Sequence, residues 1–146
     1  MTETSSSFSR AGDWEDMEHE DAKTIRIIID AFQRADWDTV RSYWDDNIVV
    51  HYSGHGPLAG DHRGKDAVIS MLQRLDELTE NTFRLEIHDV LASEDHVVVL
   101  YNESARRGGV DFAWNLVAVY HLRDGKIAEA WLHPGEQAEL DEFLSR

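Results

Sequence analysis

The chain has 146 residues and a formal net charge of −15 at pH 7, from 29 acidic and 14 basic residues. It has no cysteine, which excludes disulfide bonds, thiolate nucleophiles and Cys-ligated metals, and its acidity disfavours binding to nucleic acid or to anionic membranes. No segment approaches the roughly 20 apolar residues of a membrane helix and none has the pattern of a signal peptide, so we expect a cytoplasmic protein.

The N-terminal region divides into a polar tail and an amphipathic helix. Residues 1–14 are rich in Ser and predict a tail, and we expect a single domain over residues 15–146. A shorter helix, capped by Asp36, is predicted to follow the amphipathic helix. In the first predicted helix, residues 16–34, apolar residues recur mostly at spacings of three and four. These residues are Met17, Ala22, Ile25, Ile28, Ile29 and Phe32.

The next segment, residues 48–53, reads IVVHYS and predicts a short strand. It leads into a loop rich in Gly and His, which continues to about residue 64. A strand that carries a titratable side chain to the edge of such a loop can direct an acid or base into a pocket. A third amphipathic helix is predicted to begin near Asp66. Its expected buried residues are Val68, Met71, Leu72, Leu75 and Leu78.

The second half of the chain shows the two-residue alternation of strands. The pair Asp124-Gly125 is the strongest hairpin signal, and a closing helix is predicted over residues 136–145. Because the strands follow one another without intervening helices, they predict an antiparallel sheet with helices on one face, which is the α+β class. The four expected strands are residues 83–88, 97–106, 111–122 and 126–133.

Two segments carry a resemblance to a known superfamily. They read WDDNIVVHYSGHGPLAGDHRGKDAV at residues 44–68 and VYHLRDGKIAEAWLHPGEQAELDEFL at residues 119–144. With the order of elements, they make the chain resemble the nuclear-transport-factor-2-like (NTF2-like) superfamily, in particular its SnoaL-like and ketosteroid-isomerase-like branch. The resemblance implies a cystatin-like α+β cone. In such a cone a curved antiparallel sheet carries helices on its concave face and encloses an apolar pocket.

The resemblance also implies one catalytic position. A ketosteroid isomerase carries its proton-transferring Asp at the end of the first strand, and counting without gaps from the Asp-Asp pair before it places His51 there. The two oxyanion donors of the isomerase fall at Ile27 or Ile28 and at Ala118, and the catalytic Asp of SnoaL-type cyclases falls at about the same place as Ala118. None of these residues can donate a side-chain hydrogen bond. The remaining candidate is therefore His51 as a general base, because an imidazole titrates near neutral pH.

A second set of candidates lies in the last two predicted strands. His133 is two residues from Trp131, so both side chains point to one face, and the resemblance implies that this face lines the cavity. On the preceding strand, Tyr120 shares a face with the position of the missing donor. We expect His133 or Tyr120 to donate a proton to the ligand. The expected ligand contacts are Trp114, Trp131, Leu116, Ala118, His55 and Tyr52.

The loop also offers an alternative interpretation as a metal site. His51, His55 and His62, together with Asp61, have the donor types of a three-His site. Their spacing matches no known metal signature, so we expect no metal. The chain has no phosphate-binding or dinucleotide-binding motif, and we expect no cofactor.

These features support two hypotheses for function. The first is a cofactor-independent isomerase, cyclase or dehydratase that moves a proton on a small apolar carbonyl compound of polyketide or steroid type. The second is a non-catalytic protein of the same fold, which binds a ligand or serves only as a dimerisation module. We expect a homodimer, because apolar residues remain on the convex face of the sheet. They are Val98, Leu100, Val117 and Val119.

Overall fold

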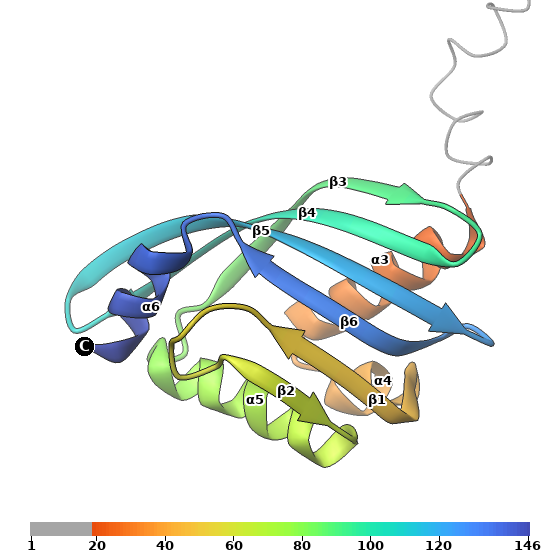
Figure 1. The fold of residues 1–146 in the computed structure, drawn as a ribbon, viewed down its shortest axis with the longest axis horizontal. Helices are drawn as coiled ribbons and strands as arrows, with labels where there is room; N and C mark the ends of the chain where they lie inside the picture. The colour runs from red at the N-terminus through yellow and green to blue at the C-terminus, as the bar shows by residue number, and fades with distance from the viewer. Residues whose placement is uncertain (1–18) are drawn as a thin grey trace, which may run out of the picture.

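The computed structural model describes residues 19–146, so the predicted tail and the start of the first predicted helix lie outside the described residues. A curved sheet of six strands has the order β2-β1-β6-β5-β4-β3 (Figure 1). The predicted α+β class is confirmed. The strands are β1 (Trp44–Tyr52), β2 (Gly60–Arg63), β3 (Arg84–Ala92), β4 (His96–Arg107), β5 (Val110–Arg123) and β6 (Lys126–Pro134).

The antiparallel meander predicted for the second half of the chain is confirmed for β3 to β6. Its tight turns use residues with positive φ, which match the twist of the flanking strands. Gly108 and Gly109 have φ of 57° and 79° between β4 and β5, and Asp124 and Gly125 have 53° and 75° between β5 and β6.

The first half of the sheet differs from the prediction in two ways. The sheet is mixed, because β1 pairs in parallel with β6, with Val50 opposite Ala130. The segment expected to be loop contains the edge strand β2, which pairs antiparallel with β1. Strand β2 reads GDHR and is mostly exposed, so it lacks the apolar alternation from which strands are recognised.

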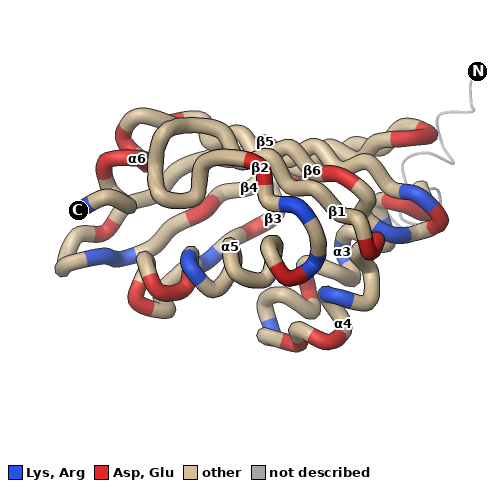
Figure 2. The backbone as a smooth tube through the Cα atoms, turned by 60° about the horizontal axis from the view of Figure 1, so that its bottom comes forward, with Lys and Arg blue, Asp and Glu red and all other residues tan. Residues whose placement is uncertain are grey.

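Three helices cover one face of the sheet and a fourth lies across its end (Figure 1). The helix α3 (Glu20–Gln33) buries the apolar stripe expected from its sequence, and Asp36 caps α4 (Trp37–Ser42) by accepting a hydrogen bond from the Thr39 backbone N–H at 3.3 Å. The other two helices are α5 (Lys65–Leu78) and α6 (Gln137–Ser145). The tube view places α3, α4 and α5 on one side of the sheet and shows acidic positions spread along the chain (Figure 2). Within residues 19–146, no helix is both long and apolar enough to span a membrane.

Candidate functional site

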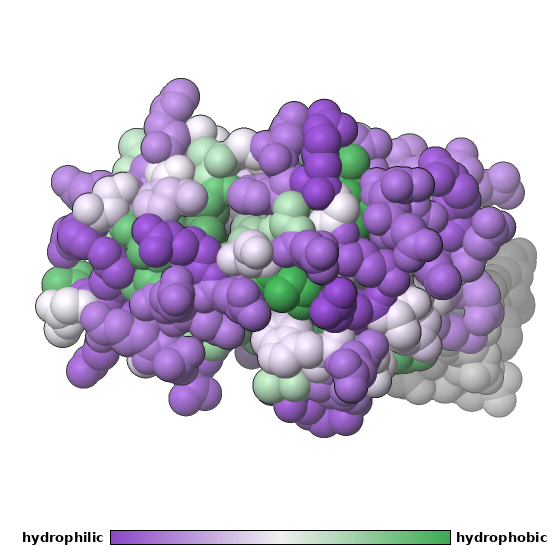
Figure 3. Space-filling view, turned by 90° about the horizontal axis from the view of Figure 1, so that it is seen from below, coloured by the Kyte–Doolittle hydropathy of each residue, from purple (hydrophilic) through white to green (hydrophobic). Residues whose placement is uncertain are grey.

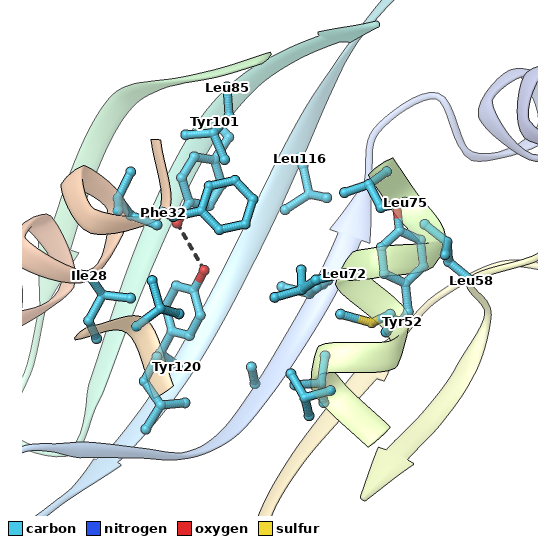
Figure 4. Close-up of a pocket in the computed structure, with 18 of the residues that line it drawn as sticks. Ile28, Phe32, Tyr52, Leu58, Leu72, Leu75, Leu85, Tyr101, Leu116 and Tyr120 are labelled. Carbon is cyan, nitrogen blue, oxygen red and sulfur yellow. Dashed lines mark hydrogen bonds between the residues drawn. The ribbon is translucent and has the colours of Figure 1, made fainter. Parts of the chain in front are cut away.

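A cavity of about 130 Å³ lies between the concave face of the sheet and the helices α3, α4 and α5. Its wall is almost entirely aliphatic and aromatic (Figure 4). Seen from below, apolar side chains appear between polar ones (Figure 3). Apolar residues that line the cavity include Ile28, Phe32, Leu58, Leu72, Leu75 and Leu116.

Four side chains bring hydroxyl or carboxyl groups to this wall: Tyr52, Tyr101, Glu103 and Tyr120. The hydroxyl groups of Tyr101 and Tyr120 are hydrogen-bonded to each other at 2.9 Å. Figure 4 shows this pair on one side of the cavity and Tyr52 on the other. The pair has two hydroxyl hydrogens, and one of them is used between the two oxygens. The second hydrogen is therefore available to a ligand.

Glu103 is the only ionisable carboxyl group in the wall of this cavity among the described residues, and its side chain is buried. Its Oε1 accepts a hydrogen bond of 2.8 Å from the indole Nε1–H of Trp114, which lies directly opposite on β5. Burial raises the pKa of Glu103 to about 8, although the Trp114 bond acts in the other direction. A carboxyl group with this pKa can accept and return a proton near neutral pH.

The three tyrosines keep their protons at neutral pH. Burial raises the pKa of Tyr120 to about 12, and it also raises the pKa of Tyr52 and of Tyr101 above the ordinary value of 10. The negative charge of Glu103 contributes to all three shifts. The cavity therefore combines one proton acceptor with several hydroxyl donors in apolar surroundings.

A comparison with protein-family models gives one match, to the SnoaL-like domain, over residues 25–130. The chain belongs to the SnoaL-like family. A search of curated proteins finds no match for this SnoaL-like protein.

Solved structures agree with this fold. Bal32a, from a soil-derived mobile gene cassette, is 29% identical with a TM-score of 0.81, over 85% of this chain and 95% of that one. A Xanthomonas campestris protein of unknown function with a cystatin-like fold is also 29% identical, with a TM-score of 0.82. The match covers 88% of this chain and 100% of that one. A proposed SnoaL-like polyketide cyclase from Jannaschia is 16% identical, with a TM-score of 0.72. The match covers 86% of this chain and 92% of that one, and at this identity it shows the fold alone.

Several residues predicted to contact a ligand lie on the cavity side of the SnoaL-like sheet. Tyr52, Leu116 and Tyr120 line the cavity. Ala118 is fully buried on the same face of β5, between two of these residues. Trp114 is buried on that face too and reaches the cavity through its hydrogen bond to Glu103.

The prediction that His51, Trp131 and His133 face the cavity is wrong. The residues of β1 and β6 that line the cavity are their sequence neighbours, such as Tyr52 and Leu132, whose side chains point to the other face of the sheet. Successive side chains of a strand alternate between faces, so a shift of one residue in the assignment reverses every side chain. Counting without gaps from the Asp-Asp pair gives the wrong parity on β1, and on β6 the face that the resemblance implied for the cavity is the opposite one.

On the convex face, His51 takes part in a polar cluster instead. Its Nδ1 lies 2.7 Å from Oδ1 of Asp61 and its Nε2 lies 2.6 Å from Oε2 of Glu129, while its ring stacks on Trp131 at 5.7 Å between centroids. The hydrogen bond to Glu129, and then that to Asp61, raise the pKa of His51. His133 makes a hydrogen bond through Nδ1 to the hydroxyl of Ser53.

The alternative metal site is not assembled. His55 is exposed, and its backbone N–H donates to the Asp141 carboxylate at 2.9 Å. The ring of His62 donates instead to the backbone carbonyl of Leu58 at 2.8 Å. Within residues 19–146 no three His, Asp or Glu side chains converge as metal ligands.

Sequence reasoning missed Glu103, although the strand pattern contained a signal for it. On β4 the buried residues alternate, and Glu103 occupies a buried position between Tyr101 and Ala105. A Glu in phase with the apolar positions of a strand is rarely buried without a functional or structural reason.

Proposed function

We propose that the protein binds a small, ring-containing carbonyl compound in the cavity and moves a proton on it, with Glu103 as the base. The observation that carries this proposal is the buried Glu103 carboxyl group, with its pKa near 8, beside a hydrogen-bonded pair of tyrosines in an otherwise apolar cavity. A base with a pKa close to the operating pH is efficient in proton transfer.

The proposed reaction begins when the Glu103 carboxylate removes a proton from the carbon beside the ligand carbonyl. The C–H bond breaks, an O–H bond forms on Glu103, and the electron pair moves to the carbonyl oxygen, giving an enolate. The free hydroxyl hydrogen of the Tyr101–Tyr120 pair donates a hydrogen bond to that oxygen. Glu103 then returns the proton to a different carbon, so the net result is an isomerisation.

The comparisons support the class of compound. The proposed polyketide cyclase from Jannaschia shares the fold of this chain, and polyketides are rich in carbonyl groups activated for such proton transfers. This likeness is at the level of the fold, so the tyrosines and Glu103 carry the chemical argument.

The first test is a reaction on a one-ring probe, the isomerisation of 3-cyclohexenone to its conjugated isomer, followed by ultraviolet absorbance. We expect the rate of the wild type to rise with pH and to level off above about 8, as Glu103 loses its proton. Glu103→Gln should lower the rate roughly 100-fold or more, and Tyr120→Phe roughly tenfold.

The control variant is Glu94→Gln, which removes an exposed carboxylate in the turn between β3 and β4 and should keep the rate of the wild type. Equal rates for Glu103→Gln and the wild type would exclude Glu103 as the base. Binding of the probe without any turnover would favour the non-catalytic alternative, for which the absence of donors at Ile28 and Ala118 already argues.

We also propose that the protein is a homodimer formed through the convex face. Besides the apolar residues expected there, Leu91 is exposed, with 52% of its surface accessible. Of the expected residues, Val117 is 38% exposed. Val98 pairs with Val119 and Leu100 with Val117 across β4 and β5, so these side chains form a continuous apolar surface.

Light scattering should therefore give a mass near twice 16.8 kDa for the wild type. Val117→Asp should shift the mass toward that of one chain, because it would place a carboxylate in the apolar contact. Gln73→Asp, at an exposed position of α5, should leave the mass of the dimer unchanged. A wild type that stays monomeric would exclude the dimer.

A further inference from the structure

A second hollow, of about 750 Å³, adjoins the cavity. The two share part of their walls, because Phe32, Phe83, Leu85 and Glu103 line both. Glu103, the residue proposed as the base, therefore lies at the boundary between the two spaces. We call the first space the inner cavity and the second the outer hollow.

The volumes limit what the inner cavity can hold. An apolar cavity of about 150 Å³ accommodates a benzene molecule, so an inner cavity of about 130 Å³ has room for roughly one six-membered ring. A polyketide or steroid with several fused rings does not fit there. A larger ligand must extend past Glu103 into the outer hollow.

The wall of the outer hollow is more polar than that of the inner cavity. Its apolar part includes Phe32, Phe83 and Leu85, which it shares with the inner cavity. The polar residues that line it include Gln33, Asp76, Asn81, Arg84, Glu86 and Asn102. A molecule that occupies both spaces therefore has an apolar end and a polar end.

Asp76 determines the chemistry of the polar end. Its side chain is half-buried, and its carboxylate has no hydrogen-bond or ion-pair partner among residues 19–146. It lies in the last turn of α5, a turn that contains no basic residue, where the helix dipole also favours positive charge. Arg84 and Glu86 line the same hollow from β3, but both are exposed and opposite in charge. A half-buried carboxylate that has no partner among residues 19–146 is well placed to accept a hydrogen bond from a ligand.

We propose that the natural ligand is elongated: one ring occupies the inner cavity, its reacting carbon lies at Glu103, and a chain ending in an amine or hydroxyl reaches Asp76. The position of the reacting carbon rests on the proposed function above. The remaining part depends only on the two spaces and on Asp76.

The test uses phenols as stable analogues of the enolate, in a series with a tail of two to five carbons opposite the hydroxyl. Each tail ends in a methyl, a hydroxyl or an amine, and the dissociation constants are measured by calorimetry at neutral pH. At the tail length that spans the boundary, the amine or hydroxyl should bind at least tenfold more tightly than its methyl counterpart, as expected for a hydrogen bond to a charged group.

Asp76→Asn should remove most of this gain and leave the binding of the methyl-ended phenols unchanged. The matched control is Glu77→Gln, which removes the neighbouring carboxylate on the same helix, whose side chain is 73% exposed. Glu77→Gln should keep the full gain in affinity from the amine or hydroxyl tail. Ala130→Leu, which fills part of the inner cavity, should weaken every member of the series.

The results separate this inference from the proposed function. If the phenols bind but no polar tail adds affinity, or if the gain survives in Asp76→Asn, the elongated ligand is wrong while the proton transfer at Glu103 stands. If the tails act as expected but Glu103→Gln keeps full activity on the one-ring probe, the proposed base is wrong and the two-part site stands. If no phenol binds, both are wrong.

Discussion

Glu103→Gln is expected to make the protein more stable than the wild type at alkaline pH, with little difference near pH 4. The pKa of Glu103 is raised from 4.5 to about 8 in the folded protein, because its charged form is buried. The folded state therefore binds more protons than the unfolded state between these two values, and the free energy of unfolding falls as pH rises through this window.

The size of the effect follows from the pKa. Each tenfold change in a proton-binding equilibrium corresponds to about 1.4 kcal/mol, so the penalty above pH 8 is roughly 5 kcal/mol. Glutamine has nearly the same shape, keeps an oxygen that can accept the hydrogen bond from Trp114, and carries no charge to bury.

Urea unfolding followed by circular dichroism at pH 4, 6 and 9 measures this difference. The free energy of unfolding of the variant should vary less with pH than that of the wild type, and the two curves should separate steadily above pH 5. Glu94→Gln again serves as the control, and it should follow the wild type at each pH. A constant difference between Glu103→Gln and the wild type at all three pH values would exclude an ionisable, buried Glu103.

Phe143→Ala should destabilise the fold by about 3–5 kcal/mol, the range found when a large aromatic side chain is removed from a core. Phe143 is 2% exposed and attaches α6 to the sheet. Its ring lies 5.3 Å from that of Phe112 and 6.3 Å from that of Trp114. The loss is expected to be at the upper part of the range, because Ala would leave a cavity enclosed by rigid rings.

Thermal and urea unfolding at neutral pH measure this loss. Glu142→Ala, the preceding residue, changes a side chain that is 76% exposed and should alter the stability by no more than about 0.5 kcal/mol. A loss of less than 1 kcal/mol in Phe143→Ala would show that α6 does not pack on β5 as described here. Since Trp114 holds the carboxyl of Glu103, the variant should also shift the pH dependence of the isomerisation.

Sequence patterns were most informative where one face of an element is buried and the other is exposed. The helices α3 and α5 have clear apolar stripes, and both were predicted within a few residues of their ends. The hairpin between β5 and β6 was predicted because Asp124-Gly125 meets a strict backbone requirement. The edge strand β2 has no apolar face, and its pairing depends on β1, so no local pattern identifies it.

The candidate site could be predicted only in part, for a related reason. On β5 the alternation is regular, and Leu116 and Tyr120 were correctly placed on one face. Strands β1 and β6 carry apolar or aromatic residues on both faces, such as Val50 and Trp131, so the alternation does not decide which face is the inner one. The proximity of Glu103 to the tyrosines depends on the register between β4 and β5, which only the folded chain establishes.

The parallel pairing of β1 with β6 also affects how the chain folds. Val50 and Ala130 are neighbours in the sheet although most of the chain separates them, so a large loop must close before the two strands can meet. During synthesis, β1 leaves the ribosome long before its partner exists, and its apolar residues lack a neighbour on that side. The pairing of β1 with β6 must therefore wait for the meander, whereas β1 can pair with β2 earlier. Contacts of such long range are formed slowly, which makes this pairing a natural late step in folding.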